Sequence, residues 1–201
     1  MSDNSNEMLG RVVVAGLRKC VEKLSKVSAG VWSVAGYDVS IGTLDEAVRR
    51  RGPDSGEAVA VYFEVKGELP FTSVILFDPR DMDRISKCFL GYSFSVSSGL
   101  SQAGELLLSE LGNIILNSFT GALSNSLKRI FMPSVPKCLR GEPQCLLGAL
   151  EASMDAGPRR IISIKLDIRC DGLITHSEVL GMIPEELARE LSGTSQKDNR
   201  L

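Results

Sequence analysis

The two halves of this 201-residue chain resemble each other at a shift of about one hundred residues, which restricts the possible folds more than any other feature. In each half an apolar, helix-like stretch comes first, and two runs of strand-like residues follow at similar spacing. The matching segments are Leu9–Arg11 with Leu111–Asn113, Trp32–Ala35 with Pro133–Pro136, and Phe63–Lys66 with Leu166–Arg169. Each half then has a proline, Pro79 or Pro184, that leads into a short helical pattern. The sequence therefore predicts an internal duplication.

Two units of this size favour one shared core over two separate domains. We expect an α+β fold in which two pseudo-symmetric repeats share one β-sheet, with two long helices packed on it. Each repeat runs helix, strand, connector, hairpin and short helix. The repeats span about residues 7–92 and 101–193 of a single domain, 1–201. A hydrophobic content of 43% is sufficient for such a core.

Hydrophobic periodicity and the positions of glycine and proline place the elements of each repeat. In the first repeat they are a helix at Met8–Lys26, a strand at Gly30–Ile41, a connector at Gly42–Gly56, strands at Glu57–Lys66 and Phe71–Phe77, and a short helix at Met82–Gly91. In the second they are a helix at Gln102–Ile130, a strand at Met132–Lys137, a candidate helix at Cys145–Met154, strands at Ile161–Cys170 and Ile174–Met182, and a short helix at Glu185–Gly193. The Arg49–Arg51 run falls in the first connector, where a solvated stretch is expected.

Charge and composition restrict the partners. A net charge of −2, with acidic and basic residues mixed, gives no electrostatic footprint for nucleic acid or an anionic membrane. There is no run of about 18 or more apolar residues, and Met1–Glu7 is polar, which favours a cytoplasmic protein without a membrane span. The five cysteines form an odd set without metal-ligand spacing, so we expect reduced thiols and no metal site.

The second long helix carries an acid and an amide three residues apart, Glu110 and Asn113. Because an α-helix turns by about 100° per residue, these two side chains lie on one face and can reach a common ligand. Asn117 and Ser124 continue that face, while leucine and isoleucine residues occupy the other side at helical spacing. A face of small polar residues, rather than of lysine and glutamate, allows another protein backbone to approach closely.

The segment from Glu110 to Pro136 resembles the CheC/CheX/FliY family of chemotaxis phosphatases, and CheC most of all. Its Glu-x-x-Asn pair is followed, after 22 intervening residues, by Pro136. The wider text, ELGNIILNSFTGALSN followed by PSVP, agrees with the same pattern. The family pattern also tends to place Asp or Ser four residues before the Glu, where this chain has Leu106.

The resemblance implies a phosphatase that accelerates hydrolysis of the aspartyl phosphate on a CheY-type response regulator, with Glu110 and Asn113 as its catalytic residues. Asn113 would orient the attacking water, and Glu110 would pair with a lysine of the regulator. No cofactor is expected on this chain itself, because the Mg²⁺ ion would belong to the regulator. The receptor deamidase CheD is a second candidate partner.

Three further residues are expected to support the site. Pro136 would fix the strand after the helix, and hence the angle of the helix, because proline locks φ and removes a donor. Asn117 and Ser124 would contribute docking contacts. In the first repeat the Glu and Asn positions hold Met8 and Arg11, or the residue before each, so no Glu/Asn pair is restored there. The resemblance therefore implies one retained site and one degenerate site.

Other catalytic chemistries have less support. Asp81 and Asp83 have the Asp-x-Asp spacing of haloacid-dehalogenase phosphatases, but Pro79 separates them from the preceding strand. Helix capping by Asp81 and the favourable placement of acids in a first helical turn explain them better. His176 lies inside an expected strand without a nucleophile elbow. The sequence contains neither a GxxxxGK[ST] nor a GxGxxG phosphate-binding motif.

Two alternatives to catalysis remain open. The first is a non-catalytic adaptor that binds a CheD-like deamidase or the flagellar switch, which Leu106 in place of Asp or Ser would favour. The second is an unrelated α/β binding domain in which the ELGN text is a coincidence.

Overall fold

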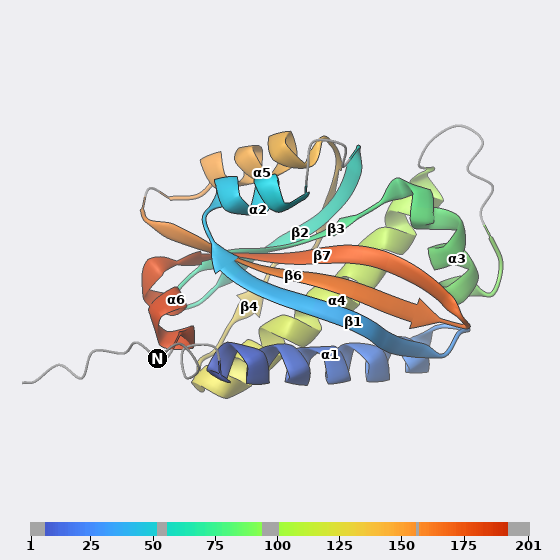
Figure 1. Cartoon of the computed structure of the whole chain (residues 1–201), viewed down its shortest axis with the longest axis horizontal. Coiled ribbons are helices and arrows are strands. Elements are labelled where there is room, and N and C mark those ends of the chain that lie inside the picture. Colours follow the sequence, from blue (N-terminus) through green and yellow to red (C-terminus); the bar gives the residue numbers. More distant parts are fainter. Residues whose placement is uncertain (1–6, 52–55, 94–100, 156, 193–201) are drawn as a thin grey trace, which may run out of the picture.

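The computed structural model describes residues 7–51, 56–93, 101–155 and 157–192. Within these ranges the chain is α+β, as expected, and one seven-stranded antiparallel sheet lies between two layers of helices (Figure 1). The first half forms α1 (Glu7–Val27), β1 (Trp32–Gly42), α2 (Leu44–Arg51), β2 (Ala58–Lys66), β3 (Phe71–Phe77), a 3₁₀ turn (Pro79–Asp81) and α3 (Met82–Leu90). The second half forms α4 (Gln102–Leu127), β4 (Met132–Pro133), β5 (Lys137–Gly141), α5 (Pro143–Ala152), β6 (Arg159–Cys170), β7 (Leu173–Pro184) and α6 (Glu185–Leu191).

The strand order shows how the two halves share the sheet. It runs β1-β6-β7-β3-β2-β5, and the short β4 also pairs with β2. The counterparts in the two halves are β1 and β5, β2 and β6, and β3 and β7. Replacing each strand by its counterpart gives the same order read from the other end, so the sheet has a pseudo-two-fold arrangement. Because β1 pairs with β6 and β5 pairs with β2, each half supplies an edge strand to the hairpin of the other half. The repeat boundaries at 7–92 and 101–193 stay a prediction.

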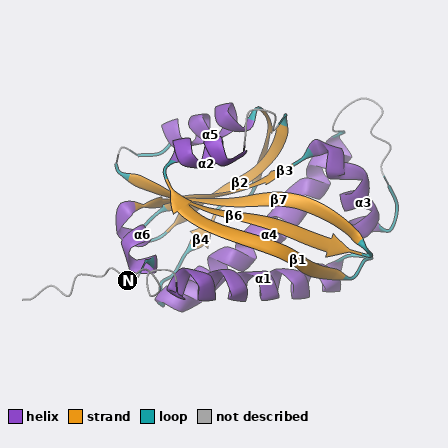
Figure 2. Cartoon of the chain, viewed as in Figure 1, coloured by secondary structure: helices purple, strands orange, loops and turns teal. Residues whose placement is uncertain are grey.

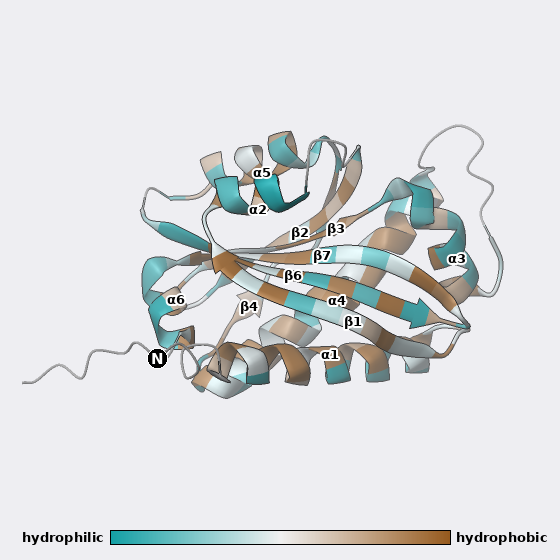
Figure 3. Ribbon diagram, viewed as in Figure 1, coloured by the Kyte–Doolittle hydropathy of each residue, from teal (hydrophilic) through white to brown (hydrophobic). Residues whose placement is uncertain are grey.

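The main core lies between the sheet and the two long helices. Figure 2 shows α1 and α4 on one side of the sheet and the shorter α2 and α5 on the other. In Figure 3, β6 alternates between hydrophobic and hydrophilic residues, as a strand with two different faces requires. The side chains buried between the sheet and the long helices include Val13, Leu24, Phe63, Ile115 and Leu116. Their burial supplies most of the driving force for docking the long helices.

The expected connector at Gly42–Gly56 contains a helix, α2, so that expectation is wrong. Thr43 and Glu46 form a reciprocal capping box: the Glu46 N–H donates to Thr43 Oγ1 at 3.3 Å, and the Thr43 N–H donates to Glu46 Oε2 at 2.8 Å. The second bond lowers the pKa of the Glu46 carboxyl group. Ala47 is buried in a second core with residues of α5 and the sheet. The sheet is therefore covered by helices on both faces.

The strand expected at Met132–Lys137 is divided into β4 and β5 by a bulge. Two residues of β2 stand opposite three residues, Ser134–Pro136. Ser134 holds the bulge to β2: its N–H donates to the Glu64 carbonyl at 2.8 Å, and its Oγ accepts the Glu64 N–H at 3.2 Å. The ladder cannot continue through Pro136, because proline has no N–H to donate. The proline that the sequence motif contains thus lies where the ladder is interrupted.

Gly112 lets α4 lie close to the sheet. A Cβ atom at this position would come within 2.8 Å of both the Cβ and a Cγ atom of Val61 in β2. It would also come within 3.1 Å of a methyl group of Ile75 in β3. These neighbours are core side chains with no free space to move into. The glycine between Glu110 and Asn113 is therefore a point of close contact between the helix and the sheet.

We expect Gly112→Ala to lower the free energy of unfolding by about 1–3 kcal/mol, because the added methyl group overpacks the helix–sheet contact. This loss opposes the better helix propensity of alanine. Gly148→Ala in α5 is the matched control, since a Cβ there meets no atom within 4 Å. Urea denaturation measures both variants, and a Gly112→Ala protein as stable as the control variant would contradict the close contact.

Candidate functional site

Glu110 and Asn113 lie in the middle of α4. The helix begins at Ser101, whose Oγ accepts the Gly104 N–H at 3.1 Å. Leu111 and Gly112 between them are buried, whereas Glu110 is exposed and Asn113 is half-buried. Among the described residues, Glu110 has no hydrogen-bond or ion-pair partner. The acid and the amide thus occupy the accessible side of a helix whose other side is fixed to the sheet.

Asn117 is bonded to Asn113 one turn earlier. Asn117 Nδ2 donates to the Asn113 backbone carbonyl at 2.9 Å and to Asn113 Oδ1 at 2.6 Å. Asn117 is half-buried, so this pair lies at the edge of the exposed surface. The Asn113 carboxamide is therefore held by its oxygen, and no other described residue is hydrogen-bonded to its nitrogen.

Ser124 makes local hydrogen bonds at the end of α4. Its hydroxyl donates to the Arg129 carbonyl, and the Arg129 N–H donates to the Ser124 carbonyl at 3.1 Å. Between them Lys128 ends the helix in a left-handed conformation, with φ of 53°. These bonds stabilise the C-terminus of the helix. The docking role expected for Ser124 stays a prediction.

β5, the strand that follows the bulge at Ser134–Pro136, packs against α4. The Cys138 thiol of β5 lies near the side chain of Ser109, the residue before Glu110. Val135 is three residues before Cys138, so it is roughly 10 Å away along the strand. Burial raises the pKa of the Cys138 thiol, and the Glu105 carboxylate raises it further. A thiol with a raised pKa stays protonated at neutral pH and is a poor nucleophile.

Two large apolar side chains are strongly exposed, one on α4 and one in the bulge. Leu106, one helical turn before Glu110, is 73% exposed, and Val135 at the tip of the bulge is 80% exposed. We call Leu106 and Val135 the apolar rim. The sequence motif leads to Leu106 only as a departure from the family pattern, and it gives no indication that Val135 is exposed.

Comparisons with known proteins identify the fold. No model of a protein family and no curated protein matches this chain. Among solved structures, FliY from Thermotoga maritima is 17% identical, with a TM-score of 0.68 over 96% of each chain. A chain of the CheX–CheY–BeF₃–Mg²⁺ complex from Borrelia burgdorferi is 16% identical, with a TM-score of 0.53 over 87% of this chain and 98% of that one. A chain of the FliG–FliM complex from H. pylori is 13% identical, with a TM-score of 0.64 over 94% and 99%.

The chain has the CheC/CheX/FliY fold. FliM, in its complex with FliG, shares the same architecture. Identities of 13–17% establish the fold and leave the activity to be argued from the residues of this chain.

The first half of this CheC/CheX/FliY fold carries no equivalent pair. Met8 is 37% exposed on α1, and Arg11 is exposed one turn later. Their side chains, a thioether and a guanidinium, cannot reproduce a carboxylate and a carboxamide. The described part of α1 therefore shows no second Glu/Asn site.

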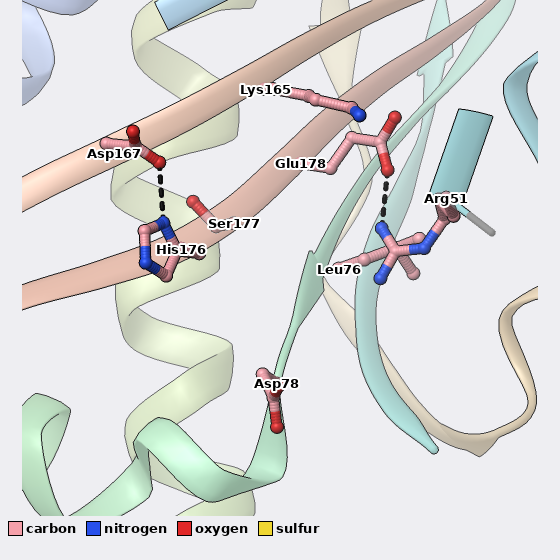
Figure 4. Close-up of a pocket in the computed structure, with 8 residues that line it drawn as sticks. All are labelled: Arg51, Leu76, Asp78, Lys165, Asp167, His176, Ser177 and Glu178. Carbon is pink, nitrogen blue, oxygen red and sulfur yellow. Dashed lines mark hydrogen bonds and ion pairs between the residues drawn. The ribbon is translucent and has the colours of Figure 1, made fainter. Parts of the chain in front are cut away.

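The opposite face of the sheet carries a polar pocket of about 250 Å³ between β6, β7 and the ends of α2 and β3 (Figure 4). Arg51 at the end of α2 donates to Glu178 of β7, and the Ser163 hydroxyl donates to the other Glu178 oxygen. The side chains of Arg51 and Glu178 are only 17% and 4% exposed. Arg49 and Arg50 are exposed, as expected of a solvated run. The expectation is wrong for Arg51, which anchors the last turn of α2 to the sheet.

The same pocket contains His176, which does not form a hydrolytic triad. His176 Nδ1 lies 2.7 Å from Asp167 Oδ1. The neighbouring Ser177 hydroxyl donates to the Leu166 carbonyl at 3.4 Å instead of to the imidazole. Among the described residues, a Ser-His-Asp arrangement is therefore not assembled here.

Asp81 has a structural role that differs from the expected helix cap. Its buried carboxylate pairs with Arg84 at 2.7 Å and accepts the His176 backbone N–H at 3.1 Å, but it makes no capping bond to α3. Asp78 caps the preceding 3₁₀ turn, Pro79–Asp81, since its Oδ1 accepts the Arg80 N–H at 2.8 Å. The Arg80 guanidinium, which also pairs with Asp78, lowers the pKa of that carboxyl group. Asp81 thus connects α3 to β7 and is not available as a nucleophile.

The described residues offer neither a cluster of metal ligands nor an exposed apolar span. No group of three or more His, Cys, Asp and Glu side chains is placed so that it could hold a metal ion. One helix, α4, is long and apolar enough to cross a membrane, but 67% of its most apolar stretch is buried in the fold. A core helix accounts for this composition.

We expect Arg51→Ala to lower the free energy of unfolding by about 3 kcal/mol or more, because it leaves the buried Glu178 carboxylate without its partner. Arg49→Ala is the matched control, since Arg49 is exposed in the same turn. Thermal and urea unfolding of the two variants measures the difference. Equal stability of the variants would show that the buried pair contributes nothing.

Proposed function

We propose that this protein is a phosphatase that accelerates hydrolysis of the aspartyl phosphate on a CheY-type response regulator in the cytoplasm. The observation that carries the proposal is the accessible Glu110–Asn113 pair. The two residues lie on one turn of α4, where Gly112 lets the helix pack closely on the sheet. A rigid helix face can enter a shallow active site on a partner and keep its side chains in place. The similarity to a chain of the CheX–CheY complex supports this class of partner.

The reaction needs no covalent step on this chain itself. The water oxygen forms a bond to phosphorus as the bond from phosphorus to the aspartyl oxygen breaks. The carboxylate leaves with the electron pair, and both water protons end on inorganic phosphate. Because the transition state is loose, positioning of the water and stabilisation of spread charge provide most of the acceleration. Mg²⁺ on the regulator would stabilise that charge.

The two site residues have complementary properties. Asn113 carries a neutral carboxamide that can hydrogen-bond to water without becoming modified. Glu110 carries a negative charge that would repel a phosphoryl group, so it suits a lysine beside the phosphate in the partner. We therefore assign Asn113 to the water and Glu110 to docking and alignment.

The apolar rim extends the docking surface toward the same regulator. Leu106 and Val135 are among the most exposed large hydrophobic residues of the described structure. Leu106 lies one helical turn before Glu110, and Val135 precedes β5, which packs against α4. Their burial against a partner would add binding energy in proportion to the apolar area covered. This surface accounts for a leucine at position 106, where an acid or serine would give a hydrogen-bonding group instead.

A non-catalytic adaptor is the second candidate function. The apolar rim and the fold shared with FliM in its complex with FliG favour it. CheD as a partner stays a prediction that no contact in the structure tests. Timed release of phosphate from a phosphorylated regulator separates the two functions, because an adaptor binds without changing the rate.

We expect Asn113→Ala to reduce the accelerated rate by about 10²-fold or more while leaving binding of the regulator largely intact, because it removes a group used mainly in the transition state. Glu110→Ala should weaken both binding and rate. Asn125→Ala, an exposed asparagine near the end of the same helix, is the control. Phosphate release and binding of a BeF₃-loaded regulator measure the two properties. Wild-type acceleration by both site variants would refute the assignment.

We expect Val135→Asp to weaken binding of the regulator by about tenfold, because a charge on the apolar rim must lose its hydration at the interface. Val31→Asp is the matched control, since Val31 is 74% exposed at the start of β1, away from α4. Titration with the BeF₃-loaded regulator gives both dissociation constants. If the two variants bind equally well, the bulge is not part of the docking surface.

A further inference from the structure

The hydrogen bonds of Asn117 fix the orientation of the Asn113 carboxamide. One terminal atom of Asn117 lies 2.9 Å from the Asn113 backbone carbonyl and 2.6 Å from a terminal atom of the Asn113 side chain. A backbone carbonyl only accepts hydrogen bonds, so the Asn117 atom must be the nitrogen. The Asn113 atom that this nitrogen meets must then accept, which makes it the oxygen. The network therefore determines both amide orientations.

It follows that Asn113 presents its nitrogen to a partner. Its oxygen is engaged by Asn117, and no other described residue is hydrogen-bonded to its nitrogen. An asparagine without such a neighbour could rotate and offer either its donor or its acceptor. Holding one orientation before the partner arrives removes the cost of ordering it during the reaction.

We propose that Asn117 is a positioning residue that keeps the Asn113 NH₂ group directed at the attacking water. This inference rests on the function proposed above. The N–H donates to one lone pair of the water oxygen and leaves the other lone pair for phosphorus. Asn117 touches neither the water nor the phosphoryl group; it acts through Asn113 alone.

Asn117→Asp tests the proposal, because it changes a donor into an acceptor at nearly constant size. The introduced carboxylate can only accept, so the Asn113 amide must turn its nitrogen inward and present its oxygen. We expect kcat to fall by about 10²-fold, as for loss of an oriented donor, with KM unchanged. Asn117→Leu removes the bond without imposing the opposite orientation, so kcat should fall only by about three- to tenfold. Asn117→Gln keeps a donor within reach and should retain most of kcat.

Hydrogen exchange of the Asn113 side-chain NH₂ group, followed by NMR, gives a readout that does not depend on activity. In the wild-type protein these protons should exchange rapidly, and in Asn117→Asp they should exchange slowly, because there they are hydrogen-bonded. Slow exchange in the wild type, or wild-type kcat in Asn117→Asp, would overturn the inference. A wild-type protein that does not accelerate phosphate release would refute the proposed function instead, and the exchange rates alone would then decide the orientation.

Discussion

The close contact between Gly112 and Val61 determines where the rest of the proposed site can be. A Cβ at position 112 would lie within 2.8 Å of Val61, so only glycine permits this spacing between α4 and β2. Because Glu110 and Asn113 flank the glycine on the same helical turns, the spacing also sets how far their side chains project. A buried packing contact thus controls the position of two exposed polar groups.

The bulge between β4 and β5 shows a second case in which a backbone constraint shapes the surface. Pro136 lies in this bulge and cannot donate to the ladder, and its neighbour Val135 is 80% exposed. Ser134 compensates for the break with two hydrogen bonds to Glu64. The proline was expected to set the angle of the helix, a role that the structure leaves untested. What the contacts show is a proline in a bulge, next to an exposed apolar residue.

Local sequence signals predicted most elements of the fold, and non-local contacts account for most of what was missed. β3 spans Phe71–Phe77 as expected, because a run of strand-forming residues between a turn and a proline is a local signal. The helix α2 was also detectable, since the Thr43–Glu46 capping box gives it a start signal, but the glycines and proline around it indicated a loop. The Arg51–Glu178 pair joins residues 127 positions apart, and no local pattern predicts it.

The differences between the two long helices bear on function more than on stability. Leu9 and Leu111, and likewise Val13 and Ile115, are buried at equivalent positions, so the core constrains both copies alike. The glycines differ: a Cβ at Gly10 would meet no atom within 4 Å, whereas one at Gly112 would clash with the sheet. Close docking on the sheet therefore occurs at the same turn as the acid–amide pair, and only in the second copy. Stability alone does not require this coincidence, because α1 is held in the same core without it. A site that must project two side chains to a fixed depth does require it.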